Sequence, residues 1–135
     1  MIPSTAYLDS SALVKLVLEE AESESLRTWI QAPTFLATCA LARTEVIRAV
    51  LLAGDAAIGR ARDLLRRLEM VALDDALLDA AGVLGPGTLR SLDAVHLAAA
   101  MGLGDDLVAV VTYDNRMAMA ALALGLHVVS PGASA

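Results

Sequence analysis

The sequence predicts an α/β fold with a central, mostly parallel β-sheet flanked by helices. Short apolar runs alternate with longer segments in which apolar residues recur at helical spacing. The short runs are continuously apolar, as expected of strands that are buried on both faces of a parallel sheet. The chain has 135 residues, of which 57% are hydrophobic, so it is long enough for one core. We therefore expect a single domain over residues 1–131, followed by a short tail at residues 132–135.

The expected elements alternate along the chain between strands and helical segments. Strands are predicted at residues 5–8, 34–37, 70–73, 107–112 and 127–129. Helices are predicted from residue 10 or 11 to residue 18 and at residues 22–31, 41–53, 56–68, 75–84, 92–101 and 116–124. Ser10 or Ser11 is expected to cap the first of these helices, and Gly54 to end the third.

The composition excludes several kinds of protein. Cys39 is the single cysteine, so an internal disulfide and a thiolate metal cluster are excluded. The longest apolar stretch, residues 117–126, is well short of the roughly 20 residues that a membrane-spanning helix needs. We see no signal peptide and expect a cytoplasmic protein without a membrane partner.

The charge of the chain constrains any role in nucleic-acid binding. Its net charge is −6 and its pI is about 4.7, whereas proteins that hold phosphates by charge alone are usually basic. Affinity for RNA would therefore depend on bound cations and on a local group of arginines. Four arginines fall on one predicted helix, with a solvated helix face as the structural alternative: Arg60, Arg62, Arg66 and Arg67.

Four acidic residues are candidates for one site. Asp9 ends the first predicted strand and Asp114 follows the strand at 107–112, so both belong at the carboxyl edge of a parallel sheet. Asp93 opens a predicted helix. Glu45 lies inside another helix with apolar residues on most sides, which predicts an inward-facing charge. Taken singly, the three aspartates could equally be helix caps or first-turn acids.

Together, the acids indicate metal-dependent hydrolysis of phosphodiesters. Acids that crowd together repel one another, and a divalent cation removes that penalty. Ligands that are all oxygen favour Mg²⁺, with Mn²⁺ as the alternative, over zinc. Such a cation activates water and stabilises charge on a phosphate, so no protein nucleophile is required; the sequence shows no convincing Ser-His-Asp or Cys-His arrangement. On this hypothesis, Asp9→Asn abolishes cleavage and leaves the metal-free fold equally or more stable.

Four segments around these acids resemble PIN-domain proteins, and more narrowly VapC-type toxin ribonucleases. Their order and spacing cover nearly the whole chain: residues 7–16 (YLDSSALVKL), 42–46 (ARTEV), 89–98 (LRSLDAVHLA) and 111–114 (VTYD). The first and third segments are the more specific, and the second alone would be a weak signal.

The resemblance implies a PIN-like three-layer sandwich and a Mg²⁺-dependent endoribonuclease toxin that hydrolyses RNA. The acids carried over as catalytic and metal-binding are Asp9, Glu45, Asp93 and Asp114, and none is missing. The family also implies a homodimer and neutralisation by a cognate VapB-type antitoxin, whose C-terminal segment covers the pocket and often inserts a basic side chain among the acids. DNA is contacted only indirectly, through the antitoxin.

Several residues near the acids have a supporting role in this interpretation. The family often has a hydroxyl at the position of Thr112, and such a group could orient water or a phosphate; ordinary β-propensity is the alternative. Ser11 and Asn115 are polar candidates for the pocket, with helix capping as the alternative. His96 lies three residues after Asp93 on the same helix face, and we favour a structural role for it over metal ligation.

The remaining polar residues leave their roles open. Arg43, Arg90 and Arg116 lie beside the acidic segments, where they could meet RNA phosphates, form ion pairs or stay solvated. No function is assigned to Cys39 or His127.

Two other classes of function stay open. The first is a phosphotransfer protein on a doubly wound sheet, which is disfavoured because Ser11 stands where a phosphatase has its second aspartate and Lys15 is the only lysine. The second is a non-catalytic module, in which the acids only hold a metal or receive a basic partner segment. Cleavage assays with Mg²⁺ or Mn²⁺ distinguish the second from a nuclease.

Overall fold

The computed structural model describes residues 4–134 and contains one five-stranded sheet in which every paired strand is parallel. The strands are β1 (Thr5–Leu8), β2 (Phe35–Cys39), β3 (Glu69–Val71), β4 (Leu107–Val111) and β5 (Val128–Val129). The helices are α1 (Ser10–Val17), α2 (Ser23–Trp29), α3 (Ala42–Val50), α4 (Asp55–Arg66), α5 (Asp75–Gly82), α6 (Ser91–Met101) and α7 (Asn115–Ala123), with short 3₁₀ turns at Leu51–Ala53 and Gly104–Asp106.

The strand order is β3-β2-β1-β4-β5, so the first strand of the chain lies in the middle of the sheet. β1 pairs with β2 on one side and with β4 on the other, and all four of its residues are buried. The chain first builds outward from β1 to β3 and then returns to add β4 and β5. The direction of winding therefore reverses between β1 and β4, which is where open α/β sheets usually place their binding sites.

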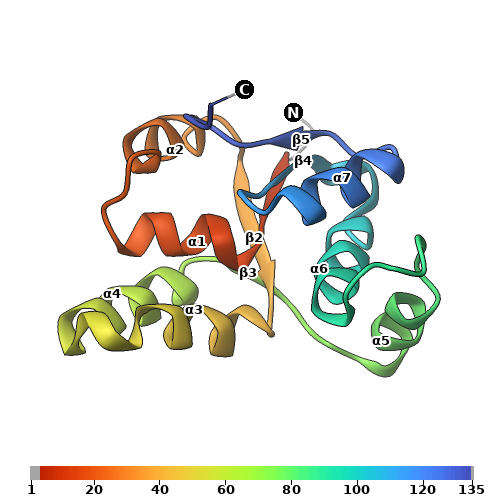
Figure 1. Ribbon diagram of the computed structural model, residues 1–135, viewed down its shortest axis with the longest axis horizontal. Helices are drawn as coiled ribbons and strands as arrows, with labels where there is room; N and C mark the ends of the chain where they lie inside the picture. Colours follow the sequence, from red (N-terminus) through yellow and green to blue (C-terminus); the bar gives the residue numbers. More distant parts are fainter. Residues whose placement is uncertain (1–3, 135) are drawn as a thin grey trace.

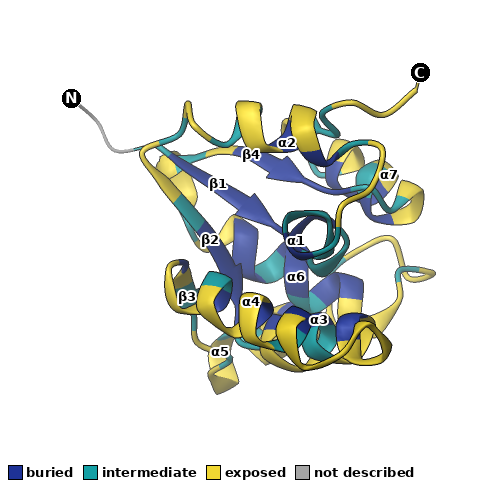
Figure 2. Ribbon diagram, turned by 90° about the vertical axis from the view of Figure 1, so that its left-hand side faces the viewer, coloured by how far each residue is buried: buried dark blue, intermediate teal, exposed yellow. Residues whose placement is uncertain are grey.

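The helices form a layer on each face of the sheet (Figure 1). Side chains alternate along β1: Ala6 and Leu8 pack into a core built with α1 to α4, whereas Tyr7 packs with α6 on the other face. α7 joins the second layer by packing Met117 against Leu97 of α6. In Figure 2 the central strand β1 is buried, as are the carboxyl-terminal halves of β2 and β4, while the outward faces of α3 and α4 are exposed.

The expected α/β class and the three-layer arrangement with a parallel sheet are confirmed. All the predicted strands and helices are present, with ends that differ by a few residues. Ala135 of the expected tail lies outside the described residues. No helix within residues 4–134 is both long and apolar enough to cross a membrane.

The N-cap predicted for α1 was wrong, and the helix predicted to stop at Gly54 does so as a 3₁₀ turn. The N-cap of α1 is Asp9, whose side chain accepts a hydrogen bond from the backbone of Ala12, and Ser10 is already the first helical residue. The helix predicted over residues 41–53 ends as an α-helix at Val50 and continues only as a 3₁₀ turn. Gly54 then reverses the chain into α4 with a φ of 98°, a conformation that favours glycine.

Candidate metal centre

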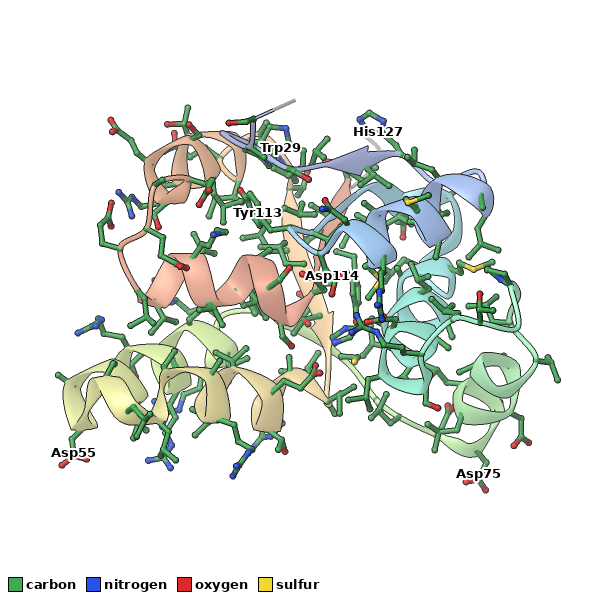
Figure 3. All side chains as sticks on the ribbon, viewed as in Figure 1. Trp29, Asp55, Asp75, Tyr113, Asp114 and His127 are labelled. Carbon is green, nitrogen blue, oxygen red and sulfur yellow. The ribbon has the colours of Figure 1, made fainter. Side chains whose placement is uncertain are left out.

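The four predicted acids line one cavity at the carboxyl edge of the sheet, although they come from distant parts of the chain. Asp9 follows β1, Asp114 follows β4, Glu45 lies on α3 and Asp93 on α6. Figure 3 shows Asp114 toward the middle of the molecule, far from the peripheral His127 and Asp75. The cavity, which we call the acidic cavity, has a volume of about 290 Å³ and is lined by the four acids together with Ser10, Ser11, Arg90, Ser91, Leu92, His96 and Met117.

Asp9 is the most buried of the four acids, with 4% of its surface exposed. Oδ1 accepts hydrogen bonds from Ser11 Oγ at 2.6 Å and from the backbone of Ala12 at 3.1 Å, and Oδ2 accepts one from Thr112 Oγ1 at 2.5 Å. Burial raises the pKa of the carboxyl, and the hydrogen bonds from Ser11 and Thr112 only partly offset that effect. Asp9 is thus fixed in position, and its charged form is electrostatically costly.

Glu45 is held from two sides through one carboxylate oxygen. Oε1 accepts hydrogen bonds from Ser10 Oγ at 2.7 Å and from His96 Nε2 at 2.6 Å. Partial burial opposes ionisation of Glu45, but the hydrogen bonds from His96 and Ser10 outweigh it and lower the pKa of the carboxyl. Burial likewise opposes a charge on His96, yet its hydrogen bonds with Cys39 and Glu45 raise its pKa to about 10. At neutral pH the pair is therefore an imidazolium and a carboxylate.

Arg90 bridges the other two acids. Its Nε donates to Asp93 Oδ2 and its Nη2 to Asp114 Oδ2, each at 2.8 Å. Asp114 also caps α7 by accepting hydrogen bonds from the backbones of Arg116 and Met117. Partial burial raises the pKa of Asp114, but the bond from Met117 and the Arg90 guanidinium outweigh it and hold the pKa below its usual range. The protein thus offsets repulsion among its acids with Arg90 and His96, so a metal ion is not needed for that purpose alone.

The donor chemistry of the acidic cavity fits a hard divalent cation. All four acids offer oxygen, which Mg²⁺ and Mn²⁺ prefer, and the guanidinium of Arg90 already places a positive charge between two of them. Within residues 4–134, no three acidic, histidine or cysteine side chains converge as a ready-made ligand set. Each acid is instead engaged by donors of the protein itself, so binding of an ion requires some of these bonds to open.

The supporting residues fall into two groups. Thr112 and Ser11 both contact Asp9, and each also accepts a hydrogen bond from the backbone, Thr112 from Asp114 and Ser11 from Tyr113. Asn115, by contrast, is exposed at the start of α7 and is not among the residues that line the acidic cavity.

His96 is buried and lies between two elements of the fold: its Nδ1 is 2.8 Å from Tyr7 Oη on β1 and its Nε2 binds Glu45 on α3. This arrangement agrees with a structural role for His96, in which the imidazole holds the side chain of Glu45. Cys39, to which no function was assigned, lies 3.7 Å from His96 Nδ1 in the same buried network.

The arginines near the acidic segments line different cavities. Arg90 lines the acidic cavity and also a neighbouring, more apolar cavity, whereas Arg116 lines only the neighbouring one of the two. Of the four arginines expected on one helix, Arg62 and Arg66 line a groove together with arginines of α3. This groove between α3 and α4, of about 610 Å³, is lined by Arg43, Thr44, Ile47, Arg48, Arg62, Leu65 and Arg66, and we call it the arginine groove.

Two contacts of the site were not anticipated from the sequence. The bond from Ser10 to Glu45 joins residues 35 positions apart, and the bond from Arg90 to Asp114 joins residues 24 apart. A partial signal existed for Arg90, because it lies three residues before Asp93 and such spacing brings side chains together on a helix. Nothing in the local sequence identifies Ser10 as the partner of Glu45.

Comparison with known proteins shows the family of the chain. The sequence profile of the PIN domain matches residues 6–122. Ribonuclease VapC46 of Mycobacterium tuberculosis strain H37Rv is 47% identical over 125 residues, which cover 93% of this chain and 96% of that protein. Ribonuclease VapC47 of Mycobacterium tuberculosis strain CDC 1551 is 42% identical over 132 residues, which cover 94% of this chain and 97% of that protein.

A solved structure supports the fold independently. The crystal structure of Mycobacterium tuberculosis VapC20, described as a sarcin-ricin loop cleaving toxin, superposes with a TM-score of 0.72 and covers 93% of this chain and 99% of its own, at 18% identity. This superposition shows the α/β fold, and the profile match shows the class of protein, the PIN-domain proteins. The chain belongs to the PIN-domain family, and its relatives place it in the VapC group of that family.

Proposed function

We propose that this chain is an endoribonuclease of the VapC type that depends on a divalent cation, Mg²⁺ or Mn²⁺, and hydrolyses RNA phosphodiesters. The observation that carries the proposal is the convergence of Asp9, Glu45, Asp93 and Asp114 from four separate elements on one cavity. The naming of relatives at 42–47% identity as ribonucleases supports the same activity.

The side chains of the acidic cavity have distinct tasks in this proposal. The four carboxylates would hold the cation, which when bound supplies Lewis-acid stabilisation of the charge on the phosphate and activation of water. Ser11 and Thr112 fix the rotamer of Asp9, and Ser10 and His96 fix that of Glu45. Preorganised carboxylates require little rearrangement during the reaction, which is the main way in which a protein lowers such a barrier.

The proposal includes partners that follow from membership of the VapC group. A VapB-type antitoxin would neutralise the toxin, the chain would act in the cytoplasm as a homodimer, and DNA would be bound only through the antitoxin. Expression of the chain alone is expected to arrest growth, and coexpression of the protein encoded beside it to restore growth.

The decisive experiment is RNA cleavage by the purified chain, free of any antitoxin, with Mg²⁺, with Mn²⁺ and with EDTA. We expect internal cleavage with either ion, none with EDTA, and none for Asp93→Asn. Asp75→Asn is the matched control, because Asp75 is exposed and lies far from the acidic cavity (Figure 3). A wild-type chain that binds RNA and either ion but leaves the RNA intact would be a binding module, and the proposal would be wrong.

A further inference from the structure

The acids of the cavity are restrained in two different ways. Asp9 and Glu45 are held by groups that belong to the interior, since Thr112 is 0% and His96 3% exposed. Asp93 and Asp114 are held by Arg90, whose side chain is 50% exposed. The first pair of acids is therefore fixed by the core of the protein, whereas the second pair is linked by one side chain that reaches in from the surface.

The contacts of Arg90 compete directly with a metal ion. The guanidinium uses Oδ2 of both Asp93 and Asp114, and Asp114 Oδ1 is already engaged by the backbone at the start of α7, so Oδ2 is the oxygen that Asp114 has left for an entering cation. A guanidinium and a divalent cation so close together would also repel each other. A cation that binds Asp114 Oδ2 between the two acids thus competes with the observed position of Arg90.

The position of Arg90 allows it to leave. The residue lies just before α6 as its N-cap position, with no side-chain capping bond, so its side chain can turn outward without disturbing the helix. Ion pairs of exposed side chains contribute little to stability, and they are broken readily.

We propose that Arg90 is a built-in counter-ion that occupies Asp93 and Asp114 in the metal-free protein and is displaced when a divalent cation binds. This inference rests on the cation site of the proposed function and adds a control on its occupancy. Arg90 lowers the affinity for the cation and in exchange removes the repulsion between two acids while no ion is bound. The acidic cavity therefore stays closed to the ion until its concentration is sufficient to displace the arginine.

The test is a direct measurement of Mn²⁺ binding to the full chain without RNA, by titration calorimetry and by the electron paramagnetic resonance of free Mn²⁺. The variants are Arg90→Gln and Arg90→Lys. Arg116→Gln is the matched control, because it removes the same charge close to Asp114 while Arg116 donates no side-chain hydrogen bond to an acid within residues 4–134. We expect Arg90→Gln to bind Mn²⁺ roughly five- to thirty-fold more tightly than wild type, because the two ion pairs of the half-exposed Arg90 no longer compete.

The other two variants test whether the effect depends on the guanidinium of Arg90 itself. Arg90→Lys is expected to give an intermediate affinity, since an ammonium carries the charge but lacks the planar fork that bridges two carboxylates. Arg116→Gln is expected to change the affinity by less than about two-fold. In a thermal unfolding assay, Arg90→Gln is expected to melt below wild type without Mn²⁺ and to gain more from added Mn²⁺.

The results distinguish failure of the counter-ion proposal from failure of the proposed function. If Arg90→Gln binds Mn²⁺ no more tightly than Arg116→Gln while wild type still cleaves RNA, Arg90 merely joins α6 to α7 and the counter-ion proposal is overturned. If neither wild type nor Arg90→Gln binds Mn²⁺, the cation site itself is absent and the proposed function fails with it. Should Arg90→Gln not fold, an affinity of Arg90→Lys equal to that of wild type overturns the counter-ion proposal on its own.

Discussion

Asp9 serves the fold and the candidate site at the same time. Its Oδ1 caps α1, and its Oδ2 faces the hydroxyl of Thr112, which itself accepts a hydrogen bond from the backbone of Asp114. Asparagine keeps one carbonyl oxygen for the cap but carries no charge. The two tasks of Asp9 are therefore separable by a single substitution.

Asp9→Asn is expected to abolish RNA cleavage while leaving the free energy of unfolding in the absence of metal equal to or above that of wild type. The physical reason is that burial dominates the electrostatics of Asp9, so the charged form is the costly one. Denaturant unfolding and cleavage assays on the same preparation test both halves. Asp79→Asn, which changes an exposed acid on α5, is expected to alter neither quantity. A large loss of stability in Asp9→Asn would mean that both of its carboxylate oxygens are needed by the fold.

Thr112→Val is expected to lower the free energy of unfolding by about 1–3 kcal/mol, because it leaves a buried carboxylate oxygen and a backbone amide without their partner. Thr38→Val is the matched control. Thr38 is also a fully buried strand threonine, but its hydroxyl has no hydrogen-bond partner within residues 4–134, so its loss is expected to be neutral or stabilising. Thr112→Ser retains the hydroxyl, so its stability and its cleavage of RNA should be close to those of wild type. Equal effects of the two valine variants would show that the Thr112 hydroxyl has no special role.

At the scale of single residues, the sequence predicted which acids meet but not what holds them. Asp9 and Asp114 were predictable because strand ends of a parallel sheet share one edge. The partners Ser10 and Arg90 were not, because each contact joins segments whose spacing depends on how whole helices pack. Side-chain contacts of this kind leave no periodic signal in the chain.

Among the elements, α3 and α6 are joined through the candidate site. These helices lie in opposite layers of the sandwich, and the bond from His96 to Glu45 links them across the edge of the sheet (Figure 1). On its other side His96 lies against Tyr7 of β1, so three elements meet at one imidazole. The relative position of the two helices therefore depends on the charge of His96.

The stability of wild type is expected to fall as the pH rises from 6.5 to 10. The folded-state pKa of His96, about 10, is raised above its ordinary value of about 6.5. A histidine whose pKa is raised by folding contributes its full stabilisation below the pKa of the unfolded state. This stabilisation is lost as the pH rises through the pKa of the folded state. Since one pKa unit corresponds to about 1.4 kcal/mol, a loss on the order of 2 kcal/mol is expected after allowance for the partial exposure of Glu45.

The measurement is denaturant unfolding of wild type and His96→Gln between pH 6 and 10. His96→Gln is expected to be less stable at pH 6 and to lose most of this pH dependence. His127→Gln, which alters a histidine on the surface, should keep the wild-type profile. A profile of His96→Gln that runs parallel to that of wild type would assign the pH dependence to other groups.

The type and order of the helices and strands could be predicted from the sequence, whereas the residues at which they begin and end could not. Continuous apolar runs such as Leu107–Val111 and the helical spacing around Ser91–Met101 predicted the type of each element. The start of α1 was misjudged because Asp9, Ser10 and Ser11 are three adjacent residues that can all cap a helix. Only the packing of β1 against β4, which fixes the backbone of Asp9 through a bond to Val111, selects among them.

For the whole molecule, the question is how a chain of net charge −6 holds RNA. The arginine groove gathers four of its ten basic residues on the outer side of α3 and α4. Within residues 4–134, Arg43, Arg48 and Arg62 form no ion pair with an acidic side chain, and Arg66 pairs only with the exposed Asp63. α3 also carries Glu45, so one helix joins this groove to the acidic cavity.

RNA affinity is therefore expected to depend on the arginine groove as well as on the bound cation. Arg48→Gln and Arg62→Gln should each weaken binding of a single-stranded RNA, and each should reduce the slope of log affinity against log salt by about 0.7, the value for one phosphate contact on a single strand. Binding is measured by fluorescence anisotropy in the Asp9→Asn background, so that the RNA stays intact.

Arg27→Gln provides the control for a change of charge, because Arg27 on α2 is already paired with Glu19 and lies outside the groove. It should leave the salt slope unchanged. Since long-range attraction acts on every exposed arginine alike and is screened over about 10 Å at 0.1 M salt, only residues that contact phosphates change the slope. Unchanged slopes for both groove variants would place the RNA on another face, and the cation would then have to supply the attraction that this acidic chain lacks.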